Sequence, residues 1–335
     1  MPFDPQTLGA LGFGAAPIGN LYQAMPEESA GATIRAALDA GIRYLDTAPH
    51  YGFGLSEKRL GLALRTLDPD ERLIVSTKVG RRLDPVPGAD LTQVRQGFVT
   101  PEPFESRFDY SYDAVMRSYD ESRQRLGRER IDILYVHDLG RFAQGDRHPD
   151  MFRQFLEGGY RAMRELRDTG AVGAIGLGVN EWEICVEALA HGDYDVMLLA
   201  GRYTLLDQSS LDRFLPLCAR RGVSIVVGGP YNSGILATGV KGPGPFNYLY
   251  QPAPPEIVAR VAAIEAVCDA HGVPLAAAAL QFPLAHPVVA SVIPGMNSPR
   301  QVEQAVSLSR HPIPAALWAD LKQRGLLRAD APVPA

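Results

Sequence analysis

Cysteine is scarce in this sequence of 335 residues, and its three copies form no pattern. Cys185, Cys218 and Cys268 lie far apart, with no CxxC pair and no Cys/His cluster around them. Such spacing excludes a disulfide framework and a zinc site, so we expect no metal. Each cysteine falls in a segment of helical periodicity, where a small buried thiol in the reducing cytoplasm is expected.

Long apolar runs and dense basic charge are lacking too. No run reaches the roughly 18 apolar residues that a membrane span needs. The start, Met1–Ala10, lacks the basic residues of a secretory signal. The net charge is −5, and no basic stripe carries interleaved aromatics. We therefore expect a small-molecule partner and neither a membrane nor a nucleic acid, and the oligomeric state stays open.

Short apolar runs rich in β-branched residues recur along the chain, with helix-period stretches between them. Such runs are typical of parallel strands that helices cover on the outside. Eight units within one domain length predict an α/β fold, a (β/α)₈ TIM barrel, rather than an open sheet. The runs are Leu11–Ala15, Arg43–Thr47, Leu73–Val79, Ile131–His137, Ala174–Val179, Asp195–Ala200, Ser224–Gly228 and Val288–Ile293.

Two internal segments and the end of the chain depart from this repeat. Arg81–Tyr110 and Thr238–Pro255 are rich in proline, glycine and polar residues, and we expect both to be long loops at the active site. No composition shift marks a second domain. We therefore predict one barrel domain over residues 1–328 and a flexible C-terminal tail over residues 329–335.

Four polar residues lie at or just after the ends of neighbouring predicted strands. Asp46 and His137 end the second and fourth strands. Lys78 lies near the end of the third strand, and Tyr51 follows Asp46 on a loop. Because parallel barrels carry their active sites at the carboxyl ends of the strands, these four are the candidate catalytic residues. An unpaired charge inside an apolar strand costs several kcal/mol, so we expect Lys78 and Asp46 to pair.

A lysine ammonium beside Tyr51 is expected to lower the pKa of its phenol from about 10. One charge at about 4 Å is worth roughly 4 kcal/mol, more than the roughly 2.7 kcal/mol that a shift of two units needs. Tyr51 would then exchange a proton with a substrate oxygen that His137 orients, while hydride moves at carbon. Taken singly, the residues have plainer roles: a packing tyrosine, an ion-paired or Schiff-base lysine and a strand-end histidine.

Several segments, in this order, resemble the signature of the aldo-keto reductases. They are Gly41–Glu57 running on to Leu60-Gly61, Ser76–Val79, Asp132–His137, Ile175–Asn180 and Ser291–Pro299. The resemblance implies a barrel that binds a nicotinamide cofactor across the strand ends, with Asp46, Tyr51, Lys78 and His137 at the positions of the catalytic tetrad. Leu139-Gly140, Gly178–Trp182 and Gly229–Leu236 resemble most the sugar-oxidising branch of that family.

The resemblance also implies a cofactor groove. Asn180 holds the nicotinamide carboxamide, Gly14 and Ala16 lie on the side of its ribose, and the loop 230–236 offers N–H groups to the pyrophosphate. The implied contacts are Gly14, Ala16, Asn180, Pro230, Tyr231, Asn232, Ser233, Gly234, Leu236, Pro294, Gly295, Met296, Asn297, Arg300 and Gln304. Tyr231 and Tyr203 are the candidates for stacking on the nicotinamide.

Two positions after the last strand favour NAD over NADP. Family members that prefer NADPH place a lysine and an arginine where this sequence has Gly295 and Gln301. A 2′-phosphate needs cationic partners. Arg300 lies one place before Gln301, but it is equally compatible with a solvated helix start.

The leading hypothesis is NAD-dependent oxidation of an aldose at C1 to the lactone, with L-fucose, L-galactose and D-arabinose as the substrate type. Phe53 and Trp182 are expected to line the sugar pocket. Alternatives with the same chemistry are oxidation of the pyridoxal hemiacetal and NADPH-dependent reduction of aldehydes. Alternatives of other classes are a cofactor-sensing regulatory subunit, which does not need an intact tetrad, and a Schiff-base aldolase using Lys78.

Overall fold

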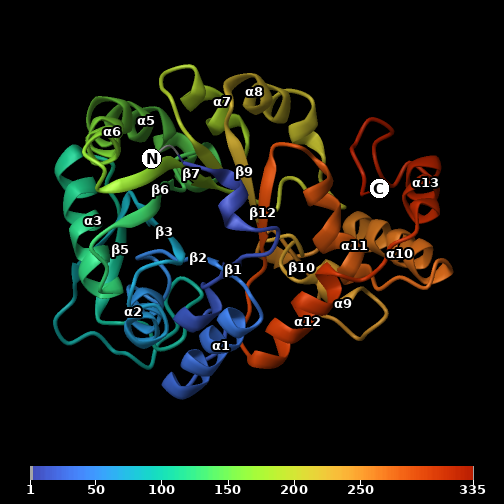
Figure 1. Cartoon of the computed structure of the whole chain (residues 1–335), viewed down its shortest axis with the longest axis horizontal. Helices are drawn as coiled ribbons and strands as arrows, with labels where there is room; N and C mark the ends of the chain where they lie inside the picture. The colour runs from blue at the N-terminus through green and yellow to red at the C-terminus, as the bar shows by residue number, and fades with distance from the viewer. Residues whose placement is uncertain (1–2, 335) are drawn as a thin grey trace.

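The computed structural model describes residues 3–334. Eight of its strands form one parallel sheet that closes into a barrel (Figure 1). Neighbours pair in the order β1, β2, β3, β6, β7, β8, β9 and β12. The strands are β1 Phe13–Gly14, β2 Tyr44–Asp46, β3 Ile74–Val79, β6 Ile131–His137, β7 Val172–Val179, β8 Val196–Ala200, β9 Ser224–Gly228 and β12 Val289–Ile293. All eight predicted strands and the barrel fold are confirmed.

Hydrogen bonds between the first and last strands close the barrel. The N–H of Gly12 donates to the carbonyl oxygen of Val292 at 3.0 Å, and the N–H of Gly14 donates to that of Pro294 at 3.0 Å. A side chain at residue 12 would meet Ile293 and Tyr44 at less than 3.0 Å, so only glycine lets the strands approach here.

Helices cover the outside of the barrel (Figure 1). In α1, Ala30, Ile34 and Ala37 recur at helical spacing and are buried against the strands. The three cysteines lie in α7, α8 and α10 and are buried free thiols, as predicted. The α-helices are α1 Glu27–Asp39, α2 Leu55–Leu67, α3 Tyr112–Leu126, α4 Arg141–Gln144, α5 His148–Gln154, α6 Tyr160–Asp168, α7 Glu183–Leu189, α8 Phe214–Arg221, α9 Ile235–Thr238, α10 Pro255–Ala270, α11 Leu275–Gln281, α12 Pro299–Ser309 and α13 Ala315–Gln323.

Apolar side chains fill the amino-terminal half of the barrel. Tyr44, Ile133 and Tyr135 pack there with Leu8, which the 3₁₀ helix η1 (Pro5–Leu8) inserts from the amino-terminal end. The barrel is therefore a packed core at this end, and polar chemistry is left to the carboxyl ends of the strands.

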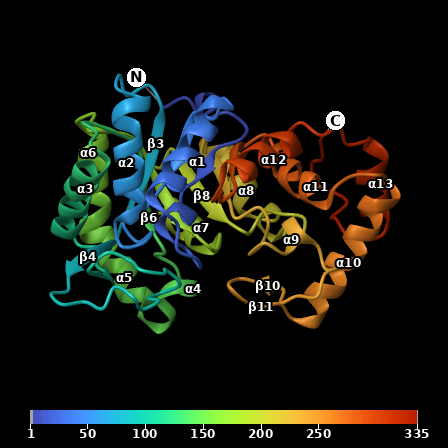
Figure 2. The ribbon, with the colours of Figure 1, turned by 90° about the horizontal axis from the view of Figure 1, so that it is seen from below.

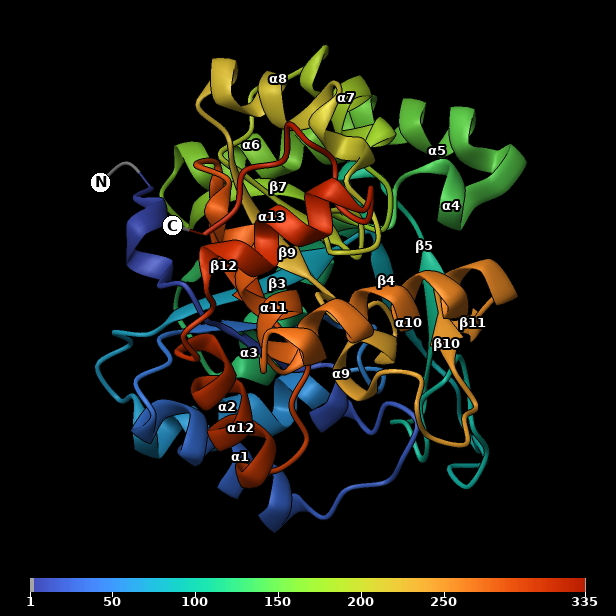
Figure 3. The ribbon, with the colours of Figure 1, turned by 90° about the vertical axis from the view of Figure 1, so that its right-hand side faces the viewer.

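The two long segments lie together at the carboxyl end of the barrel (Figures 2 and 3). Each contains an antiparallel hairpin rather than being an irregular loop throughout. The first pairs β4 (Arg81–Pro85) with β5 (Phe104–Phe108), and the second pairs β10 (Asn247–Tyr248) with β11 (Gln251–Pro252). Both hairpins reach over the edge at which the tetrad was predicted.

The end of the chain packs on the barrel. Arg328 forms ion pairs with Asp330, at 2.7 Å, and with Asp212, which lies just before α8. Ala331 is buried. These contacts involve residues 330 and 331 of the predicted tail. Residue 335 of that tail and residues 1–2 of the predicted domain lie outside the described residues. Within residues 3–334, no single helix is long and apolar enough to cross a membrane; α10 and the following helix pass that test only as a pair bent by 101°.

Candidate active site

A buried ion pair forms the floor of the site. The Lys78 Nζ atom of β3 lies 2.9 Å and 2.7 Å from the two carboxylate oxygens of Asp46 at the end of β2. The ammonium donates its third hydrogen bond to the carbonyl oxygen of Thr47 at 2.8 Å. Both side chains are at most 3% exposed, so the predicted pairing is confirmed.

A polar chain inside the barrel extends this pair. The Ser76 hydroxyl donates to Asp46 Oδ1 at 2.7 Å, and the Tyr44 hydroxyl lies 3.0 Å from Ser76 Oγ and 3.3 Å from the Tyr135 hydroxyl. Sequence patterns missed Ser76, Tyr44 and Tyr135 because alternation along a strand marks them only as inward-facing. The chain holds the Asp46 carboxylate in one orientation beneath the site.

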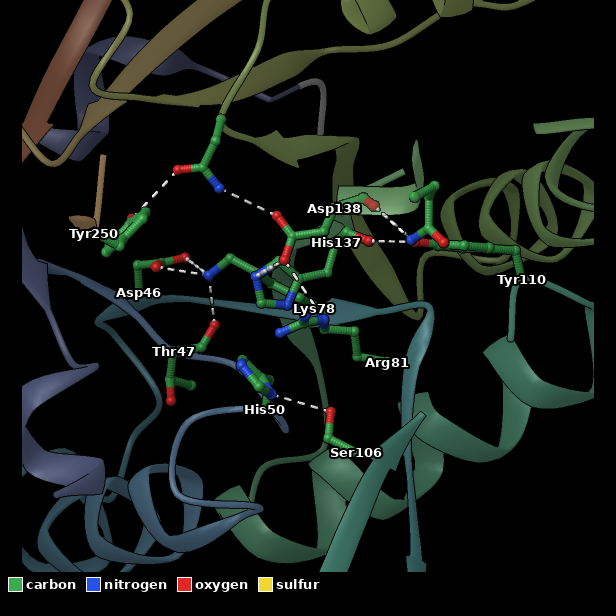
Figure 4. A network of polar contacts seen from close by, with 12 residues as sticks. Asp46, Thr47, His50, Lys78, Arg81, Ser106, Tyr110, His137, Asp138 and Tyr250 are labelled. Carbon is green, nitrogen blue, oxygen red and sulfur yellow. Dashed lines mark hydrogen bonds and ion pairs between the residues drawn. The ribbon is translucent and has the colours of Figure 1, made fainter. Parts of the chain in front are cut away.

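Tyr51 and His137 complete the predicted cluster. The Lys78 Nζ atom lies 4.8 Å from the centroid of the Tyr51 ring, and the Tyr51 and His137 rings meet edge to face with centroids 5.9 Å apart. Asp46, Tyr51, Lys78 and His137 therefore gather at one place, from β2, the turn after it, β3 and β6. Figure 4 shows three of them, Asp46, Lys78 and His137.

The expected acidity of Tyr51 is not observed. Burial raises the pKa of Tyr51 well above 10, and the negative charge of Asp46 raises it further. Lys78 does not lower this pKa because its charge is matched by Asp46 and its hydrogen bonds go to Asp46 and Thr47. The ammonium lies near Tyr51 as predicted, but Asp46 matches its charge more fully than expected.

Two histidines stand side by side above the ion pair. The rings of His50 and His137 lie 5.9 Å apart, and the Nδ1 of His50 lies 3.0 Å from the hydroxyl of Ser106 in β5. Burial lowers the pKa of both histidines well below 6.5, and the cations of Arg81 and Lys78 lower it further. Both rings are therefore neutral at physiological pH and can donate one hydrogen bond each. His50 was not predicted as a site residue. The signal that could have identified it is its position directly before Tyr51 within the Gly41–Glu57 signature.

A second polar network lies on the other side of His137 (Figure 4). Asp138 Oδ2 lies 3.6 Å from the Nε2 of His137 and 3.5 Å from the Nε of Arg81. The Nδ2 of Asn180 lies 3.3 Å from Asp138 Oδ1, and its Oδ1 lies 3.3 Å from the hydroxyl of Tyr250. Asp138, Arg81 and Tyr250 were not predicted, because they enter the site from a strand end and two hairpins that periodicity does not position.

The loop that was expected to bind pyrophosphate has an unusual backbone. Asn232, Ser233 and Gly234 follow one another with positive φ angles of 46°, 60° and 96°. The buried Oδ1 of Asn232 has no hydrogen-bond partner within the described residues. Tyr250 meets this loop as well, since its N–H donates to Ser233 Oγ at 3.0 Å. The N–H groups of Asn232 and Gly234 donate to the carbonyl oxygens of Gly229 and Tyr231, both at 3.0 Å. Among the described residues, the N–H of Ser233 has no backbone acceptor, so it is the donor that this run would offer to an anionic group.

Several other predicted cofactor positions lie at the edge formed by the ends of β1 and β12. Gly14 and Gly295 form a β-bridge between the ends of β1 and β12, with Ala16 and Pro294 beside them. Asn297 precedes α12, and Arg300 and Gln304 lie exposed on that helix. Met296 and Leu236 are buried, so neither presents an open surface to a cofactor. Asn180, the Asn232 loop and this edge are the places that would hold an extended dinucleotide, and the Asn180 amide would exchange its partners Asp138 and Tyr250 to bind one.

Two of the four aromatic predictions are corrected. Phe53 is fully buried under Arg95 and Phe98, so it supports the site and cannot line a sugar pocket directly. Tyr203 is also fully buried, packed against Phe282, and cannot stack on a nicotinamide. Trp182 and Tyr231 are partly exposed, and their contacts with the sugar and the nicotinamide stay predictions. Tyr250, 55% exposed, is an additional aromatic at the mouth.

Comparison with known proteins gives a consistent picture. The model of the aldo/keto reductase family matches residues 10–324. The chain is 46% identical to pyridoxal 4-dehydrogenase from Microbacterium luteolum, over 96% of this chain and 95% of that one. It is 42% identical to D-threo-aldose 1-dehydrogenase from a Pseudomonas species, over 95% and 94%. L-galactose dehydrogenase from Arabidopsis thaliana is 32% identical, over 90% and 84%.

Solved structures agree on the fold. An aldo-keto reductase from Bacillus halodurans in its holo form superposes with a TM-score of 0.71 at 27% identity, covering 96% of this chain and 93% of that one. Members of this family use NAD or NADP. The chain therefore belongs to the aldo/keto reductase family and is an NAD(P)-dependent oxidoreductase that resembles its sugar-oxidising members.

Proposed function

We propose that this protein oxidises an aldose at its anomeric carbon to the lactone, with NAD as the hydride acceptor, in the cytoplasm. The observation that carries the proposal is the gathering of Asp46, Tyr51, Lys78 and His137 at one end of the barrel. The 42% identity to D-threo-aldose 1-dehydrogenase over nearly the whole chain supports the substrate class.

Tyr51 is the proposed proton acceptor. When bound, the nicotinamide ring supplies the site that receives the hydride from C1. The deprotonated Tyr51 takes the proton of the C1 hydroxyl, so that the C1–H and O–H bonds break as the lactone C=O bond forms. His137, kept neutral by burial and by Arg81, donates its Nε2 proton to a substrate oxygen and orients it. Lys78 and Asp46 hold the floor beneath Tyr51.

The cofactor is proposed to lie along the edge formed by the ends of β1 and β12. Asn180 would hold the carboxamide, the left-handed loop at Asn232 and Ser233 would hold the pyrophosphate, and α12 would face the adenosine. We propose NAD rather than NADP because the Gln301 side chain accepts a hydrogen bond from the N–H of Asn297 at 2.8 Å and offers no cation.

A second candidate substrate is pyridoxal. It is favoured by the 46% identity to pyridoxal 4-dehydrogenase, the higher of the two identities. Pyridoxal in its hemiacetal form presents the same reacting group as a pyranose or furanose, so the tetrad chemistry is unchanged.

The test is turnover of L-fucose, L-galactose, D-arabinose and pyridoxal, followed by absorbance of the reduced nicotinamide with NAD and with NADP. Oxidation of at least one sugar with a higher kcat/KM than pyridoxal is expected. Turnover of pyridoxal alone would replace the substrate class, and a Tyr51→Phe variant with unchanged turnover would contradict the mechanism.

A further inference from the structure

Asp138 is a carboxylate in the site whose backbone is held by several hydrogen bonds. It follows His137 directly and adopts a left-handed backbone with φ of 52°, which costs free energy for a residue other than glycine. The Tyr110 hydroxyl donates to the carbonyl oxygens of His137 at 2.8 Å and of Asp138 at 3.0 Å. The Nε2 of Gln144 donates to Asp138 as well, at 2.9 Å. This clamp fixes the backbone so that the carboxylate points at His137 (Figure 4).

The Asp138 carboxylate has few close partners for a group so well buried. Its side chain is 12% exposed, and its contacts are long: 3.3 Å to Asn180, 3.5 Å to Arg81 and 3.6 Å to His137. An ionised carboxylate offers about four acceptor positions, and burial makes each unfilled one costly. A donor supplied by the substrate would fill one of them.

Arg81 supplies the complementary donor. Its guanidinium packs over the Phe108 ring at 4.5 Å, which fixes it at the start of β4. Its side chain is 16% exposed beside the Asp138 carboxylate. A hydroxyl group between the two would donate to Asp138 and accept from Arg81, whereas an ether or a carbonyl can only accept and a methylene can do neither.

We propose that Asp138 and Arg81 form a subsite for a substrate hydroxyl on the carbon next to the reacting carbon. The inference rests on the proposed function, since His137 marks where the reacting oxygen lies. The Nε2 of His137 and Oδ2 of Asp138 are 3.6 Å apart, a spacing comparable to that of oxygens on adjacent carbons. The subsite selects polyhydroxylated substrates and disfavours simple aldehydes, because an analogue without the hydroxyl leaves the buried carboxylate unpaired.

The test compares D-arabinose with 2-deoxy-D-ribose, which differ only in the hydroxyl at C2. The variant is Asp138→Asn, because asparagine tolerates the left-handed backbone and keeps the shape while removing the charge. The matched control is Asp195→Asn, which removes another carboxylate paired with an arginine, Arg167 at 2.9 Å, at the amino-terminal end of the barrel.

We expect the wild-type protein to prefer D-arabinose in kcat/KM by about 100-fold or more. Asp138→Asn should reduce that ratio by about tenfold or more, with the loss falling on D-arabinose, while Asp195→Asn keeps the wild-type ratio. Equal ratios in the wild-type protein and in Asp138→Asn overturn the subsite even though sugar oxidation stands.

Failure of the proposed function is distinguishable from failure of the subsite. If the wild-type protein oxidises no sugar, calorimetric binding of the two sugars to its complex with NADH tests the subsite alone. Preferential binding of D-arabinose that disappears in Asp138→Asn supports it. Equal binding of both sugars, or binding of neither, overturns it.

Discussion

The two carboxylate oxygens of Asp46 lie 2.9 Å and 2.7 Å from the Nζ of Lys78, and neither side chain is more than 3% exposed. Removal of one partner leaves the other charge buried without compensation. We expect Lys78→Met to lower the free energy of unfolding by about 3–5 kcal/mol and to abolish most of kcat. The double variant Lys78→Met/Asp46→Asn should regain part of the stability but none of the activity. Urea titration measures the first effect, and wild-type stability of Lys78→Met would contradict it.

Regular periodicity made the barrel predictable. Apolar runs in the sequence predict the eight strands. Two of these runs, Ile131–His137 and Ser224–Gly228, have the same bounds as the strands β6 and β9. The tetrad was predictable for a related reason: a charged residue that interrupts such a run, like Lys78, must find a partner on a neighbouring strand.

The Asp138 network was not predictable in the same way. Its geometry depends on a left-handed residue, on a hairpin that brings Arg81 over β6, and on Tyr250 from a second hairpin. None of these leaves a periodic trace in the sequence. The error on the acidity of Tyr51 has a similar origin, since it depends on how completely Asp46 matches the charge of Lys78.

The pH dependence of sugar oxidation should follow Tyr51. Tyr51 must be deprotonated to accept a proton, and burial with the Asp46 charge raises its pKa well above 10 in the protein alone. The deprotonated fraction therefore grows about tenfold per pH unit below that pKa, and we expect kcat/KM to rise from about pH 7 to about pH 10. Measurement of initial rates across this range checks the prediction. A plateau of kcat/KM that begins near neutral pH would contradict the prediction, because it would mean that the pKa of Tyr51 is not raised.

Acid should destabilise the protein through its paired histidines. Burial lowers the pKa of His50 and His137 below 6.5 in the folded protein, while the unfolded chain keeps the ordinary value. The stability that these neutral rings contribute is present above pH 6.5 and is lost as pH falls below it, by about 1.4 kcal/mol per pH unit and histidine. Urea midpoints at about pH 7.5 and about pH 5.5 measure this loss. His50→Gln should reduce the slope by about half, and an unchanged slope would exclude His50 as a contributor.

Gly178 in β7 leaves room for the stem of Lys78. A Cβ atom there would lie 3.2 Å from the Cε of Lys78, closer than ordinary contact, and 3.4 Å from the Cβ of Tyr135. We expect Gly178→Ala to displace the ammonium from Asp46 and to lower kcat by about tenfold, while the fold is kept. The control is Gly31→Ala in α1, where nothing lies within 4 Å and alanine should add up to about 1 kcal/mol of stability. Steady-state kinetics with both variants check the pair, and full activity of Gly178→Ala would show that Lys78 adapts.

Cofactor choice should respond to a single cation on α12. The Oε1 of Gln301 accepts a hydrogen bond from the N–H of Asn297. A Cβ atom added at Gly295 would lie 3.0 Å from the Cγ of Pro17, so Gln301 is the better position for a new cation. We expect the wild-type protein to prefer NAD over NADP by about tenfold or more, and Gln301→Arg to shift the ratio of kcat/KM values towards NADP by about the same factor, because an arginine can bind a 2′-phosphate through two hydrogen bonds. Glu303→Gln changes the net charge of the helix by the same amount without adding a cation. If that control shifts the ratio as far as Gln301→Arg does, the effect is the general field of the helix, and contact between residue 301 and the phosphate is excluded.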